Sequence, residues 1–143
     1  CRKPLVVIDG AHCPLSAAAL RKTLEQYFPK RQKILILGIL KGKNAGGIWN
    51  ELKKDKHLKK VILFAPSSPR ALPAESLAEI VHPDNPDAMV CKSLESAIKQ
   101  AAMLVSDDDM IVVAGSLYNI ATEKKFLDLT TQTQKDDTSI NVE

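Results

Sequence analysis

The chain has 143 residues, of which 45% are hydrophobic and only 4% are aromatic. A chain of this length can bury roughly two-thirds of its unfolded surface, so we expect a single globular domain with its own core. So few aromatic residues argue against a nucleic-acid platform on which bases stack. The longest apolar runs have the length of strands, and the sequence therefore predicts neither a membrane-spanning segment nor a signal peptide.

The net charge of +3 hides an uneven distribution along the chain. Residues 1–60 contain 14 Lys and Arg against 4 Asp and Glu, whereas residues 61–143 contain 6 against 13. A basic half can face an anionic ligand or phosphates held by a neighbouring domain, or it can be a solvated surface. We favour the solvated surface for residues 53–60, and ligand binding for Lys41 and Lys43, which lie near the motifs described below.

The three cysteines, Cys1, Cys13 and Cys91, do not have the spacing of a disulfide framework. They also form no Cys-x-x-Cys pair that would hold a metal ion, so we expect no metal site within the chain. This usage of cysteine favours reduced thiols in a cytoplasmic protein.

Apolar runs and helical patterns alternate along the chain, which is typical of a parallel sheet covered by helices. Helical spacing of apolar residues begins at Pro14 and again after Asn44, Pro73 and Ser93, all of them residues typical of helix starts. Trp49 falls within the second of these helices, where we expect it to pack rather than to stack on a ligand. We therefore predict an α/β fold, a three-layer Rossmann-like domain with a mostly parallel sheet. Its strands are predicted at residues 5–9, 33–38, 60–65, 88–91 and 110–114.

The end of the chain differs from the rest in composition. Residues 130–143 are mostly polar and lack a period, which predicts a disordered tail after a domain that spans residues 1–129. No Gly-x-x-x-x-Gly-Lys-Ser/Thr loop occurs, because the glycines of residues 42–47 stand in the wrong order. The chain by itself therefore shows no evident means of holding the triphosphate and magnesium of ATP.

The most informative motif is DGAHCP at residues 9–14, which lies where the first predicted strand turns into a helix. In a parallel α/β sheet, ligands bind at the carboxyl ends of the strands. Gly10 allows a tight turn there, while Asp9 and His12 place an acceptor and a titratable donor beside the start of a helix. The sequence therefore predicts a ligand site at this junction.

This motif resembles the Asp-x-Ala-His-Asn-Pro segment that opens the C-terminal domain of Mur-type ligases, and within that superfamily it most resembles folylpolyglutamate synthase/dihydrofolate synthase. Three further stretches agree in order, namely residues 36–43 (ILGILKGK), 65–73 (APSSPRALP) and 114–118 (AGSLY). The resemblance spans roughly residues 5–128. It departs from the family at Cys13, where Asn is usual, and a thiol is a poor substitute for an amide. A catalytic role for this thiol is possible beside a helix start, but we disfavour it.

The resemblance implies the C-terminal, substrate-binding domain of an ATP-dependent ligase that adds L-glutamate to folate or dihydropteroate through an acyl phosphate. ATP and Mg²⁺ would be bound mainly by a central ATPase domain that is not part of this sequence. The family's arginine that contacts ATP would also fall before residue 1. We therefore expect the isolated domain to be inactive and to contain no catalytic residue of its own.

The proposed chemistry needs a neutral amine held about 3 Å from the carbonyl carbon, so this domain must grip the carboxylates of glutamate. Each candidate residue also has a structural explanation. Asp9 could cap a helix, His12 could satisfy backbone groups, and Lys41 could be a surface lysine. Arg70 could pin the loop of residues 66–73, and the residue after Gly115 could be an N-cap. His57 and His82 lie in polar or proline-flanked loops and are expected to be exposed. The resemblance implies that Asp9 binds the ribose of ATP and that glutamate is bound by His12, Lys41, Arg70 and Ser116.

Two other functions stay open. The chain could belong to another Mur-type amino-acid ligase, although Asn-Pro-Arg-Glu in place of Ser68-Pro69-Arg70-Ala71 would have favoured that. It could also be a non-enzymatic Rossmann-like binding module, which the missing phosphate-binding loop would allow. Neither nucleic acid nor a membrane is an expected partner.

Overall fold

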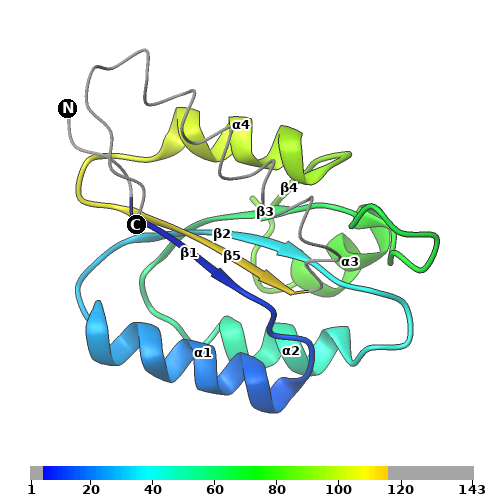
Figure 1. Ribbon diagram of the computed structural model, residues 1–143, viewed down its shortest axis with the longest axis horizontal. Coiled ribbons are helices and arrows are strands. Elements are labelled where there is room, and N and C mark those ends of the chain that lie inside the picture. Colours follow the sequence, from blue (N-terminus) through cyan, green and yellow to red (C-terminus); the bar gives the residue numbers. More distant parts are fainter. Residues whose placement is uncertain (1–4, 116–143) are drawn as a thin grey trace.

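The computed structural model describes residues 5–115, and Figure 1 shows a central sheet between two layers of helices. The predicted alternation of strands and helices is confirmed. The strands are β1 (Leu5–Asp9), β2 (Lys33–Gly38), β3 (Leu58–Leu63), β4 (Met89–Val90) and β5 (Met110–Gly115); the helices are α1 (Pro14–Tyr27), α2 (Ala45–Leu52), α3 (Ala74–Val81) and α4 (Leu94–Leu104).

The five strands form one sheet in the order β1-β5-β2-β3-β4, and every ladder between them is parallel. This confirms the predicted three-layer fold with a parallel sheet. Three strands differ from their predicted bounds, and of these β5 is only one residue longer, since it ends at Gly115 rather than at residue 114. β3 begins at Leu58 rather than at residue 60, and β4 has only two residues. Residues 59 and 60 are lysines, so the apolar run that was used to predict this strand begins after the true start of β3.

Alternate residues of the strands face two separate cores, as side chains of a β-strand point to opposite faces. In β2, Leu35 and Leu37 face the core that contains residues of α1, α2 and α3, whereas Ile34 and Ile36 face the core beneath α4. Both faces are covered (Figure 1), which explains why β2 and β5 are continuous apolar runs rather than alternating ones.

Helix starts follow the predicted chemistry. The Asn44 side chain accepts a hydrogen bond from the Gly47 N–H at 2.9 Å, and Ser93 forms a capping box with Ser96. Pro73 directly precedes α3, and Pro14 is the first residue of α1. Trp49 is 2% exposed and donates its indole N–H to Asp84 at 3.0 Å, which confirms that it packs in the core.

Several lysines of the basic segment at residues 53–60 have acidic partners within the domain. Lys53, Lys54 and Lys59 form ion pairs with Asp84, Glu51 and Asp109 respectively.

The predicted exposure of His57 and His82 is wrong, because both rings are half-buried. The ring of His57 lies 3.1 Å from the side-chain amide of Gln32, and His82 reaches the Ala88 carbonyl at 3.0 Å. Their loops fold back on the amino edge of the sheet.

The predicted boundary at residue 129, the tail at residues 130–143, and Ser116 all lie outside the described residues. Within residues 5–115, no helix is both long and apolar enough to cross a membrane.

Candidate functional site

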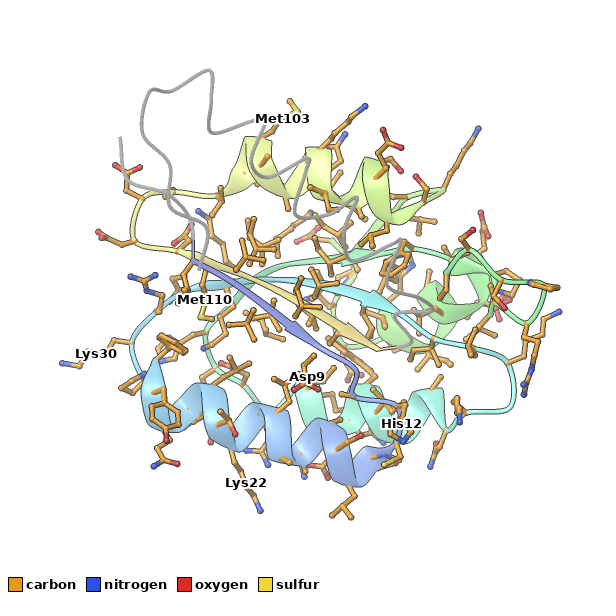
Figure 2. All side chains as sticks on the ribbon, viewed as in Figure 1. Asp9, His12, Lys22, Lys30, Met103 and Met110 are labelled. Carbon is orange, nitrogen blue, oxygen red and sulfur yellow. The ribbon has the colours of Figure 1, made fainter. Side chains whose placement is uncertain are left out.

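The carboxyl ends of β1, β5 and β2 lie side by side and define the edge at which the candidate residues gather. Asp9 pairs in register with Ala114, and Gly38 pairs with Gly115. Figure 2 shows Asp9 where β1 ends and His12 just beyond it, in the turn that leads into α1. By the alternation of the strand, Asp9 belongs to the face that α1 and α2 cover, and no described residue pairs with its carboxylate.

The turn between β1 and α1 holds His12 at the surface. Ala11 is fully buried and anchors the turn, while His12 is exposed. The His12 N–H donates to the Ser16 hydroxyl at 3.0 Å, and His12 Nδ1 lies 3.0 Å from the Gly10 carbonyl oxygen. A carbonyl can only accept, so Nδ1 carries the proton. A neutral ring is therefore an acceptor at Nε2, and only the imidazolium form could donate there to a carboxylate.

Cys13 is the N-cap of α1, a role that the sequence had not predicted for it. Its Sγ accepts a hydrogen bond from the Ser16 N–H at 3.4 Å, and its own N–H donates to the Ser16 hydroxyl at 3.1 Å. Hydrogen bonds from the Ser16 side chain and backbone lower the pKa of the Cys13 thiol, and the charge of Lys43 lowers it further. Asn is a preferred N-cap residue, so the thiol takes over a capping function at this position.

The starts of α1 and α2 lie against each other at the same edge. A Cβ atom added to Gly47 would lie 2.6 Å from Pro14 Cγ, so the two first turns are in close contact. Lys43 immediately precedes the N-cap of α2, and its charge acts on Cys13 at the start of α1. The sequence marked Lys43 only as a basic residue near a motif. Its proximity to the β1–α1 turn depends on how the two helices pack.

Lys41 and Arg70 occupy two β-turns that face each other. The Lys43 N–H donates to the Leu40 carbonyl, and Gly42 has a φ of +84°, as a type II turn requires at its third position. In the second turn, the Ala71 N–H donates to the Ser68 carbonyl at 3.1 Å, with Pro69 at the second position.

Backbone hydrogen bonds join these two turns. The Lys41 N–H donates to the Arg70 carbonyl at 2.7 Å, and the Leu72 N–H donates to the Ile39 carbonyl at 2.9 Å. An antiparallel bridge between Leu40 and Ala71 lies between these bonds. Lys41 therefore stands opposite Arg70, and both side chains are exposed.

Two glycines, Gly38 and Gly115, allow the ends of β2 and β5 to approach each other closely. A Cβ atom on Gly115 would lie 1.9 Å from the Gly38 carbonyl oxygen, and Gly115 has a φ of +103°. A Cβ atom on Gly38 would meet the ring of Phe64 at 2.6 Å. Glycine is required at position 115 by its φ and by the backbone atom that it faces, whereas a side chain at position 38 would require the Phe64 ring to shift. The chain leaves β5 at this point toward Ser116, whose place is outside the described residues.

The structure thus brings Asp9, His12, Lys41 and Arg70 to one edge of the sheet, and it pairs Lys41 with Arg70 directly. No hydrogen bond or ion pair joins the side chains of Asp9 and His12 to those of Lys41 and Arg70. Within residues 5–115 no three side chains of His, Cys, Asp or Glu gather as metal ligands. A cavity of about 440 Å³ opens at the opposite, amino edge of the sheet, where Trp49, Lys53 and Asp84 line it.

Comparison with known proteins supports the resemblance. Residues 1–117 match the family described as "Mur ligase, glutamate ligase domain". A dihydrofolate synthase/folylpolyglutamate synthase from Mycobacterium tuberculosis is 36% identical over 108 residues, which cover 73% of this chain and 21% of that enzyme.

Two solved structures have the same fold. The M. tuberculosis folylpolyglutamate synthase, complexed with ADP and AMPPCP, has a TM-score of 0.76 at 30% identity and covers 84% of this chain. A bifunctional folylpolyglutamate synthase/dihydrofolate synthase with Mn, AMPPNP and L-glutamate bound has a TM-score of 0.74 at 25% identity and covers 90%. The match takes up only 29% and 30% of those chains. The chain belongs to the glutamate ligase domain family of the Mur ligases.

Proposed function

We propose that this chain is the C-terminal domain of an ATP-dependent ligase that adds L-glutamate to folate or dihydropteroate in the cytoplasm. The observation that carries this proposal is the carboxyl edge of the sheet. There, Lys41, Lys43 and Arg70 are exposed, and no carboxylate of residues 5–115 forms an ion pair with them. Parallel sheets bind ligands at this edge, and the positive charge of these side chains favours an anionic substrate there.

In the proposed reaction, the amine of glutamate attacks an acyl phosphate formed on the folate. Arg70 offers a planar fork and Lys41 a compact charge to a carboxylate of glutamate, which would orient the amine. His12 would contact glutamate from the β1–α1 turn, where a neutral ring accepts a hydrogen bond at Nε2. Ser116, which follows Gly115 in the sequence, would add a hydroxyl.

Asp9 would accept hydrogen bonds from the ribose hydroxyls of ATP. The ATP phosphates and Mg²⁺ would be held mainly by the central ATPase domain of the same parent chain, since the described residues offer no cluster of metal ligands. The open, exposed character of the edge agrees with a site that is completed by a second domain. The relatives named above are three or more times longer than the matched region, which supports such a division of labour.

Another Mur-type amino-acid ligase is the second candidate, because the family match alone does not select the amino acid or its acceptor. The relative at 36% identity favours the folate enzyme. The solved relative with L-glutamate bound favours this amino acid.

The proposal is tested by comparing ADP release from the isolated chain and from the full-length ligase, each supplied with ATP, Mg²⁺, L-glutamate and a dihydropteroate or folate acceptor. We expect turnover only from the full-length enzyme, and only with glutamate and a pterin acceptor present. Turnover with a different amino acid and a peptidoglycan precursor would favour the second candidate. ADP release by the isolated chain would contradict the assignment of ATP to the central domain.

A further inference from the structure

The Ser16 hydroxyl ties the β1–α1 turn to the first turn of α1. It accepts a hydrogen bond from the His12 N–H at 3.0 Å and another from the Cys13 N–H at 3.1 Å, and it donates to the Cys13 carbonyl at 3.0 Å. A hydroxyl has one proton to donate and two lone pairs with which to accept. The two residues that lead into α1 therefore fill the bonding capacity of Ser16.

The start of α4 contains the same capping box and shows which of these bonds is additional. There the Ser96 hydroxyl accepts from the Ser93 N–H at 3.2 Å and donates to the Ser93 carbonyl at 3.1 Å. These two bonds satisfy the backbone of a helix start. Lys92 stands where α1 has His12, and within residues 5–115 its N–H makes no bond to the Ser96 hydroxyl. The bond from His12 to Ser16 is thus not needed to begin a helix.

The ring of His12 is held by a second hydrogen bond. Its Nδ1 donates to the Gly10 carbonyl at 3.0 Å, so the backbone and the side chain of this exposed residue are both anchored (Figure 2). Within residues 5–115 no group bonds to Nε2, which leaves this nitrogen for a ligand. A ligand would meet a ring that is already oriented and would not have to order it.

We propose that Ser16 is a positioning residue that acts through His12. Its hydroxyl fixes the backbone of the turn, which keeps Nδ1 on the Gly10 carbonyl and leaves Nε2 for the ligand. The inference rests on the proposed function only for the identity of that ligand, the amino acid that His12 would contact. The hold on the ring is a property of this domain and can be measured without any substrate.

The capping box of α4 supplies the control for a purely structural role. Ser16→Ala and Ser96→Ala each delete the hydroxyl of a capping box, so both should lower the midpoint of thermal unfolding by similar amounts. Only Ser16→Ala should also release His12. Ser16→Thr retains a hydroxyl at the same position and should keep the ring in place.

The first experiment measures the chemical shifts of the His12 ring nitrogens in the isotopically labelled 143-residue chain, above the pH at which the ring titrates. These shifts distinguish a protonated ring nitrogen from an unprotonated one. We expect the Nδ1–H form in the original chain, in Ser96→Ala and in Ser16→Thr, and a mixture of the two tautomers in Ser16→Ala. An unchanged Nδ1–H form in Ser16→Ala would overturn the proposal, as would an equal change in Ser96→Ala. Circular dichroism checks that each variant is folded.

The second experiment measures the KM for L-glutamate and the KM for ATP in the full-length ligase. Ser16→Ala should raise the KM for glutamate by about threefold to tenfold, since a hydrogen bond that orients His12 is lost, and should leave the KM for ATP within about twofold. Ser96→Ala and Ser16→Thr should stay within about twofold of the unaltered enzyme for both substrates. An equal loss for both substrates in Ser16→Ala, or a loss that Ser96→Ala reproduces, would assign Ser16 to helix stability alone and overturn the proposal.

His12→Ala separates failure of this inference from failure of the proposed function. If His12→Ala leaves the KM for glutamate unchanged, the proposed contact between His12 and glutamate is wrong, and the ring shifts still decide whether Ser16 holds the ring. If His12→Ala raises the KM for glutamate and Ser16→Ala does not, the contact stands and the role of Ser16 is overturned.

Discussion

Substitution of Gly115 by alanine tests whether the close approach of β5 and β2 shapes the carboxyl edge. The new Cβ would lie 1.9 Å from the Gly38 carbonyl oxygen, a backbone atom that cannot move aside without shifting β2. The φ of +103° adds backbone strain, because L-residues with a side chain disfavour this region. Strain costs about 1–2 kcal/mol, and overpacking of this kind costs about 1–3 kcal/mol more.

Gly42→Ala is the matched control, since Gly42 also has a positive φ but has no atom within 4 Å of an added Cβ. Gly42→Ala should lower the free energy of unfolding through backbone strain alone. The substitution also lowers the entropy of the unfolded chain, which offsets part of the strain, so the net loss should be about 1 kcal/mol. We therefore expect Gly115→Ala to lower the free energy of unfolding by about 1–3 kcal/mol more than Gly42→Ala. Urea unfolding followed by circular dichroism measures both values. Equal losses in the two variants would refute the close approach.

Three further predictions concern stability and nucleotide use. Asp55→Ala should lower the free energy of unfolding by about 3–5 kcal/mol, because it leaves the buried Lys33 ammonium without its partner; Glu95→Ala, which breaks only an exposed pair, should change it by no more than about 0.5 kcal/mol. Burial raises the pKa of the Asp109 carboxyl, but hydrogen bonds from Lys59 and from the Ser106 N–H outweigh it and hold the pKa below its usual value. Its ionised form therefore stabilises the fold above about pH 4, and this contribution is lost as the pH falls through the lowered pKa; acid titrations of Asp109→Asn should lack this part of the loss, and an unchanged acid profile would argue against it. In the full-length ligase, Asp9→Ala should raise the KM for ATP by about tenfold or more and leave the KM for glutamate nearly unchanged, since a ribose contact would be lost; an unchanged KM for ATP in a folded variant would contradict the ribose assignment.

The fold could be predicted from sequence because local signals agreed with one another. The β-branched runs of β1, β2 and β5 are buried on both faces, and Pro14 and Asn44 mark helix starts through their own backbone and side-chain chemistry. The start of β3 was missed because tertiary contacts decide it. Lys59 and Lys60 are strand residues whose ammonium groups reach Asp109 and the Asp87 carbonyl, partners that lie far along the chain.

The candidate site was predictable in place but not in arrangement. The alternation of strands and helices puts residues that follow strands at one edge, which located Asp9, His12 and Lys41. The pairing of Lys41 with Arg70 depends on two backbone hydrogen bonds between segments about 30 residues apart, and no local pattern encodes them. The capping role of Cys13 was missed for another reason, because thiols are uncommon N-caps and the residue was weighed for reactivity rather than for backbone satisfaction.

The most direct test of the account is a kinetic comparison of Arg70→Ala with the unaltered full-length ligase, in which L-glutamate and ATP are varied separately. If Arg70 binds the amino acid as proposed, loss of the guanidinium would remove a donor to its carboxylate and would leave the nucleotide contacts in place. The account predicts that the KM for glutamate rises by about tenfold or more while the KM for ATP stays within about twofold. An equal loss for both substrates would contradict it and would assign Arg70 to the structure of its turn, and an unchanged KM for glutamate would remove Arg70 from the binding site altogether.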